Sequence, residues 1–160
     1  MAQDIFERLK QDHDKHRELI EAIMATEGAS EERKTLFEQF KTEVTAHAAT
    51  EEETLYATMM TISEGRHDAQ HSVSEHKELG DKLEELAEMD MASSGWLNSF
   101  RTLRHDYLHH IDEEEEEMFP AAEKLIEESK AVELKEEFEE RKPEELERAL
   151  EGADEGDDRD

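Results

Sequence analysis

Apolar residues in this chain recur at alternating steps of three and four, the spacing that gathers side chains on one face of an α-helix. The first such face consists of Phe6, Leu9, His13, His16, Ile20 and Ile23. A break at residues 28–30 precedes a second face, which consists of Phe37, Phe40, Val44, His47, Glu51 and Leu55. Histidines and a glutamate therefore occupy inward positions of the first two predicted helices.

Two further faces follow a polar turn at residues 63–65. The third face, in a helix expected to end near residue 90, consists of His76, Leu79, Leu83 and Leu86. After residues 93–95 the fourth face consists of Phe100, Leu103, Tyr107, His110, Glu114 and Met118. Four amphipathic helices with short connections predict an all-α protein with the fold of an antiparallel up-down four-helix bundle.

The chain beyond the bundle has a different pattern. From about residue 131 the apolar positions are interrupted by Pro143, which predicts one or two short helices packed against the bundle. The final stretch, EGADEGDDRD, is charged and contains glycine, so we expect it to be disordered. The predicted division is a four-helix bundle at 1–128, a C-terminal helical extension at 129–150 and an acidic tail at 151–160.

An internal duplication relates the two halves of the predicted bundle. An offset of 63 residues superposes the apolar positions of the first two helices on those of the last two. The same offset places His13 on His76, His47 on His110, and Glu51 on Glu114. A single shift therefore registers all four helices and repeats one set of inward polar side chains.

This repeated set has the composition of a metal site. A histidine and a glutamate four residues apart lie one turn above the other on the same helix face. The alternative is a polar core whose side chains hydrogen-bond to one another, but two buried carboxylates repel unless a cation lies between them. Imidazole and carboxylate without thiolate suit Fe, Mn or Zn, and bridging carboxylates with vacant positions favour a pair of iron ions.

The histidine-glutamate spacing also occurs off the inward faces, at His71/Glu75 and His109/Glu113. We expect His67, His71 and His105 on the surface. His109 should point about 100° away from its neighbour His110, either supporting the site or exposed. In the acidic run 112–117 only Glu114, and marginally Glu117, has an inward phase, and the other carboxylates are expected to face solvent.

His16 lies on the inward face of the first helix, but the repeat places it opposite Leu79. Its periodicity alone leaves two interpretations open, a further ligand and a hydrogen-bonded core histidine.

Composition limits the classes of function. The chain has 47 Asp and Glu against 19 Lys and Arg, a formal net charge of -28, which argues against binding nucleic acid or anionic membranes. Leu, Ile, Val and Phe make up only 29 of 160 residues, a level typical of disordered chains, so the fold prediction depends on periodicity. There is no cysteine, which excludes thiolate sites. With no basic leader and no spanning apolar run, we expect a cytoplasmic protein. We also expect a monomer.

Four segments resemble the hemerythrin-like HHE cation-binding family over about residues 5–125: LKQDHDKHREL, HAATEEETLY, SEHKELGDKLEEL and HHIDEEEEEMFP. The resemblance implies an oxo- or hydroxo-bridged centre of two iron ions. It also implies that Glu51 and Glu114 are bridging carboxylates. The terminal ligands that it implies are His13, His47, His76 and His110.

The chain departs from the oxygen-carrying branch of that family, which uses five histidines and an H-x-x-x-H pair on its third helix. Here Ser72 and Gly80 flank His76 at that spacing. We therefore expect a di-iron protein that binds or turns over a small oxidant, O2, H2O2 or NO, with catalase-like peroxide chemistry favoured. The alternatives are an iron, oxygen or redox sensor without turnover, and metal buffering.

Overall fold

The computed structural model describes residues 2–154, and every regular element in that range is helical. Four long helices form the bundle: α1 (Ile5–Met24), α2 (Glu31–Glu51), α4 (Arg66–Glu88) and α5 (Ser94–Glu113). Helix α2 continues through the π-helix η1 (Glu52–Tyr56) into α3 (Ala57–Met60). Helix α5 continues in the same way through the π-helix η3 (Glu114–Met118) into α6 (Phe119–Glu123). A 3-10 turn, η2 (Ser63–Gly65), precedes α4, and α7 (Glu128–Asp154) follows the bundle.

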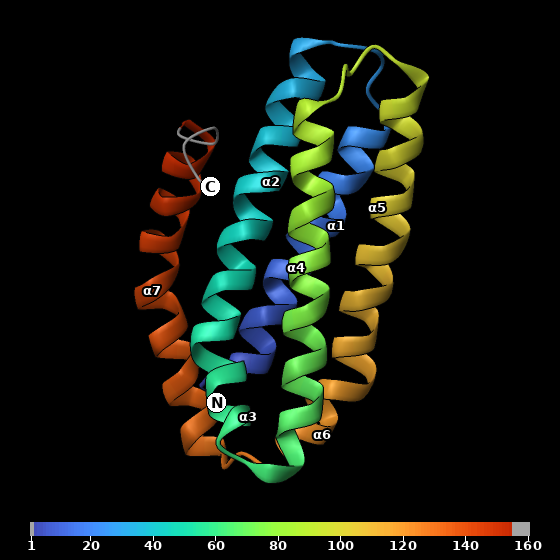
Figure 1. The fold of residues 1–160 in the computed structure, drawn as a ribbon. Coiled ribbons are helices and arrows are strands. Elements are labelled where there is room, and N and C mark those ends of the chain that lie inside the picture. Colours follow the sequence, from blue (N-terminus) through green and yellow to red (C-terminus); the bar gives the residue numbers. More distant parts are fainter. Residues whose placement is uncertain (1, 155–160) are drawn as a thin grey trace.

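The four long helices run antiparallel to their neighbours in the ring order α1, α2, α4, α5 (Figure 1). The α1–α2 and α4–α5 connections lie at one end of the bundle, and the α3–α4 and α6–α7 connections lie at the other. This arrangement confirms the predicted all-α bundle.

Short polar side chains fix where the bundle helices begin. Asp4 and Glu7 form a capping box at the start of α1, and the Ser30 and Ser93 hydroxyls accept hydrogen bonds from backbone N–H groups in the first turns of α2 and α5. Gly28 adopts a φ of 58° in the α1–α2 connection, a conformation that favours glycine. The predicted break at residues 28–30 is thus an end of one helix and a capped start of the next.

The few apolar side chains are buried efficiently, in two clusters. One cluster, at the α3/α6 end, contains Phe6, Leu55 and Phe119. The other, at the opposite end, contains Phe40, Trp96 and Phe100 with their neighbours. The inward histidines and glutamates form a polar layer between these clusters. Periodicity therefore outweighs the low apolar content.

The C-terminal extension differs from its prediction, because α7 is one continuous helix of 27 residues that passes through Pro143. Pro143 and Glu139 are both exposed, so the carbonyl that loses its proline partner can be hydrated. The helix lies along α1 and α2 (Figure 1) and buries Leu134 and Phe138 against the bundle. It also includes residues 151–154, which we expected in the disordered tail, and residues 155–160 lie outside the described range.

None of the helices within residues 2–154 is both long enough and apolar enough to cross a lipid bilayer.

Candidate metal centre

The six side chains that the duplication singles out converge in the polar layer, and all six are buried. They form two groups, each with one potential ligand atom per residue and all three atoms within 4.8 Å of one another. The first triad is His13, His47 and Glu51, and the second triad is His76, His110 and Glu114.

The two glutamates lie between the triads. Glu51 Oε1 is 3.8 Å from His47 Nε2 in its own triad and 3.2 Å from His76 Nε2 in the other. Glu114 Oε1 is 3.4 Å from His110 Nε2 and 3.3 Å from His13 Nε2, which is the same arrangement in the other half. Each carboxylate therefore faces imidazoles from both triads, as a bridging ligand must.

Each of the four imidazoles is hydrogen-bonded through Nδ1 to a further carboxylate. The Nδ1–H groups donate to these supporting carboxylates as follows: His13 to Glu115 at 2.7 Å, His47 to Asp12 at 2.8 Å, His76 to Glu52 at 2.9 Å, and His110 to Glu75 at 2.7 Å. An ionised carboxylate can only accept, so Nδ1 carries a hydrogen, and Nε2 is the ring nitrogen that faces the interior. This pattern orients metal-binding histidines in many proteins.

Six of the atoms that face the interior have no hydrogen-bond partner of their own. They are Nε2 of His13, His47 and His110, both carboxylate oxygens of Glu51, and Oε1 of Glu114. A buried polar atom without a partner costs about 1–3 kcal/mol, and more when it is charged. Side chains that satisfied one another would not leave six such atoms converging. The donor set therefore fits metal ions, in place of the hydrogen-bonded polar core that was the alternative.

Comparison with known proteins agrees with this geometry. The family model described as the hemerythrin HHE cation binding domain matches residues 4–122. The chain belongs to the hemerythrin HHE family. A solved structure of an HHE cation binding domain-containing protein from Mycobacterium kansasii is similar at 25% identity, with a TM-score of 0.81 over 94% of this chain and 91% of that chain. No curated protein matches the sequence of this HHE domain significantly.

The electrostatics of the two triads favour a cation between them. Burial and the charge of Glu51 raise the pKa of Glu114 well above its ordinary value. Burial also acts to raise the pKa of Glu51, but the nearby imidazoles of His76 and His47 lower it. Without metal, each of the two facing carboxyls therefore opposes ionisation of the other. Metal ions in that position would let both carboxylates ionise.

Two histidines respond to the same negative charges. Burial acts to lower the pKa of His13, but Glu114 and Glu115 outweigh it and raise the pKa to about 9. The pKa of His76 is likewise raised to about 9 by Glu51 and Glu52 against the effect of burial. The carboxylates that stabilise an imidazolium proton here would also stabilise a metal ion at the same nitrogen.

Both glutamate-bearing helices of this HHE domain change their winding at the site. The π-helix η1 starts immediately after Glu51, and the π-helix η3 starts at Glu114. Such widened turns are rare and frequently occur at functional sites. The amino-acid pattern gave no signal for them, although the duplication relates their positions to within one residue.

His16 lies beside the first triad and outside it. The ring is fully buried, its centroid is 5.0 Å from that of His47, and its Nδ1 lies 2.7 Å from the Tyr107 hydroxyl. Its Nε2 atom has no hydrogen-bond partner. The structure thus makes His16 a core neighbour of the centre and does not bring it into either triad.

Other sequence predictions for this layer have mixed outcomes. His67, His71, His105 and His109 are exposed, as expected from their helical phase. Glu117 is also exposed, so Glu114 alone in the acidic run turns fully inward.

The prediction was wrong for Glu115, which is half-buried and supports His13. The offset of 63 residues could have revealed this role, because it relates Glu52 to Glu115 just as it relates Asp12 to Glu75.

One contact breaks the twofold pattern. The Tyr56 hydroxyl donates to Glu114 Oε2, whereas the repeat places Phe119 opposite Tyr56. Glu114 is therefore held by a phenol as well as by its own helix.

Proposed function

We propose that this HHE domain holds two iron ions and turns over hydrogen peroxide. The observation that carries the proposal is the position of Glu51 and Glu114, each of which faces imidazole Nε2 atoms of both triads. Two carboxylates shared in this way suit a pair of adjacent ions. Iron is favoured over manganese or zinc for redox chemistry, and all three suit the donor atoms.

The number of ligands leaves room for a small molecule. Four imidazoles and two shared carboxylates do not saturate two ions, and vacant positions are what ligand binding or catalysis requires. When bound, two adjacent iron ions supply the two-electron change by which two H2O2 become two H2O and one O2. No other reductant or oxidant is needed for that balance.

The remaining side chains keep the ligands in place. The supporting carboxylates hold each imidazole with Nδ1 protonated and Nε2 directed inward. Tyr56 fixes one oxygen of Glu114 through its hydroxyl and leaves Oε1 directed toward the imidazoles. Apolar clusters above and below the polar layer exclude bulk water from these contacts.

Access is provided on the side of the second triad. A surface pocket of about 290 Å³ between α2 and α4 is lined by His76, Glu52 and Gly80. The His76 side chain keeps 5% of its surface exposed, whereas that of its repeat equivalent His13 keeps none. Water or peroxide can therefore approach His76 more readily than His13. This openness favours turnover over the protected oxygen binding of a carrier.

Metal analysis and an optical spectrum of the freshly purified protein test the iron content, with two ions per chain expected. Oxygen release from H2O2 would then be compared among wild type, His110→Ala and an equal amount of free ferric ion. We expect wild type to be clearly fastest. A rate no higher than that of free ion, or a stable oxygenated spectrum that reverses under argon, would replace turnover by sensing, carriage or metal buffering.

A further inference from the structure

The two outward histidine-glutamate pairs that the buried centre does not use meet on the surface. His71 and Glu75 lie on α4, and His109 and Glu113 lie on the neighbouring α5. His71 Nε2 is 3.3 Å from Glu75 Oε1 and 3.1 Å from Glu113 Oε1. His109 Nε2 lies 3.4 Å from the second oxygen of Glu113. The four side chains thus form one continuous cluster across the α4/α5 groove.

These separations match the edges of a metal coordination shell. Ligand atoms about 2.1 Å from one ion lie about 3.0–3.4 Å apart in octahedral or tetrahedral geometry. A hydrogen bond explains the cluster less completely, because His71 Nε2 carries at most one hydrogen and faces two acceptor carboxylates. One cation would satisfy His71, Glu75 and Glu113 together.

The first half of the repeat shows what this position requires. The equivalent of Glu75 is Asp12, whose oxygens accept from Arg8 Nη1 at 2.6 Å and from Lys142 Nζ at 2.8 Å. Two permanent cations thereby offset the charge of the carboxylate that supports His47. Arg8 is also the repeat equivalent of His71. A protein cation in one half corresponds to a potential metal ligand in the other.

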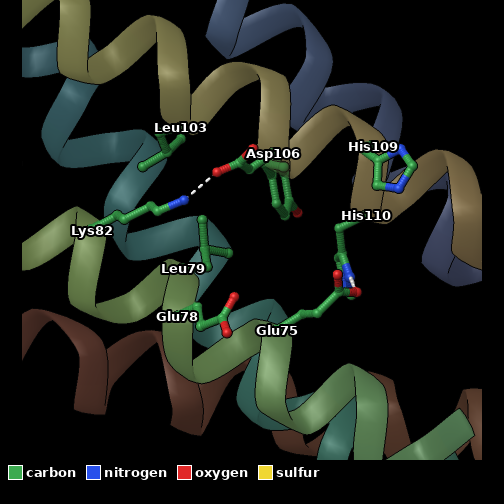
Figure 2. A pocket seen from close by; sticks show the side chains of 9 residues that line it. Glu75, Glu78, Leu79, Lys82, Leu103, Asp106, His109 and His110 are labelled. Atoms are coloured by element: carbon green, nitrogen blue, oxygen red, sulfur yellow. Dashed lines mark hydrogen bonds and ion pairs between the residues drawn. The ribbon is translucent and has the colours of Figure 1, made fainter.

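In the described part of the chain, no such protein cation pairs with Glu75 in the second half. Within residues 2–154, the ion pairs of Glu75 are with His71 and His110 and include no lysine or arginine. Lys82, which lines a pocket in the same α4/α5 groove as Glu75, pairs with Asp106 instead (Figure 2). Glu75 is directed toward His110 in the same view. Its charge therefore lacks the compensation that Arg8 and Lys142 provide for Asp12.

We propose that His71, Glu75 and Glu113 form a third metal site, which takes a divalent transition-metal ion from solvent. Imidazole with two carboxylates suits ions of the Mn2+ to Zn2+ series, and His109 can add a second imidazole. The bound ion takes the role of Arg8 and Lys142 and is linked through the Glu75 carboxylate to His110. The link to the buried centre rests on the proposed function, whereas binding at the outer site does not.

Calorimetric titration with Ni2+ tests the site on the full chain after iron loading. Excess Mg2+ occupies all-oxygen sites, and about 1 M KCl shortens the Debye length to about 3 Å, which suppresses diffuse binding to the acidic surface. Wild type should bind one Ni2+ at the outer site. His71→Ala and Glu113→Gln should each weaken that binding about tenfold or more, whereas His67→Ala, one turn earlier on α4, should leave it unchanged.

Unchanged Ni2+ affinity in His71→Ala and Glu113→Gln, or an equal loss in His67→Ala, would overturn the proposal. If the chain retains no iron, the same titration is carried out on metal-free protein. The outer site is then detected as one bound Ni2+ that wild type has and the His71→Ala variant lacks. Loss of the buried centre and loss of the outer site are therefore separate results.

Discussion

The two halves of the duplicated bundle carry the same set of candidate metal ligands in different surroundings. In the first half, α7 covers the α1/α2 groove, and the ammonium of Lys142 lies 2.8 Å from Asp12 and 3.5 Å from Glu43. In the second half the corresponding α4/α5 groove is a pocket of about 240 Å³ lined by Glu75 and Asp106 (Figure 2). These two carboxylates are the repeat equivalents of Asp12 and Glu43.

The other groove of the polar layer shows the same contrast. Arg17 pairs with the supporting carboxylate Glu115 at 3.0 Å, between α1 and α5. Its repeat equivalent is Gly80, which borders the open pocket beside Glu52. The duplication has therefore kept the inward ligands, while the protein cations that close and neutralise the site remain on one side. The six inward side chains are therefore repeated in both halves, whereas the coverage of the grooves beside them differs.

The largest expected effect concerns the part that the halves share. Glu51→Ala and Glu114→Ala should each empty both metal positions, because each carboxylate faces imidazoles of both triads. Metal content per chain, measured after removal of loosely bound ions, should fall from about two to near zero.

The matched control is Glu117→Ala, which changes an exposed carboxylate in the same acidic run. Its metal content should equal that of wild type. Retention of one ion at full occupancy in Glu51→Ala or Glu114→Ala would mean that the two halves bind metal independently.

The inward ligands could be predicted from sequence because their signals are local and repeated. A histidine and a glutamate four residues apart continue one helix face, and the same offset that aligns Phe37 with Phe100 aligns His47 with His110. The contacts that distinguish the halves are not local. Lys142 lies 130 residues from Asp12, and no periodicity connects them.

Two other features escaped prediction for related reasons. The π-helical turns begin at or directly after the glutamates, and the residue pattern there is the same as for an α-helix. The continuity of α7 through Pro143 depends on burial of Phe138 against the bundle, which outweighs the hydrogen bond lost at the proline.

A smaller effect is expected where a cation balances buried charge in one half alone. Lys142→Met should lower the free energy of unfolding by about 3 kcal/mol, because it removes the buried ammonium between Asp12 and Glu43. Lys82→Met breaks the corresponding pair with Asp106, which is exposed, and should cost less than about 1 kcal/mol. Urea denaturation of the metal-free variants measures both, and equal losses would show that α7 does not distinguish the halves energetically.

The smallest expected effect is on access to the second triad. Gly80→Arg introduces at this position the residue type that its repeat equivalent, Arg17, provides in the α1/α5 groove. The new guanidinium can reach toward Glu52 across the pocket. Peroxide turnover should fall about three- to tenfold, which corresponds to a rise of about 0.7–1.4 kcal/mol in activation free energy, at unchanged metal content.

Gly80→Ala is the control, since a Cβ there meets no atom within 4 Å. This variant should keep wild-type turnover while stabilising α4 by about 0.4–1 kcal/mol. Turnover that is unaffected by the arginine would exclude this pocket as the route and leave the groove beside His110 as the approach. Equal losses in both variants would instead point to a requirement for glycine flexibility in α4, because alanine fills almost none of the pocket.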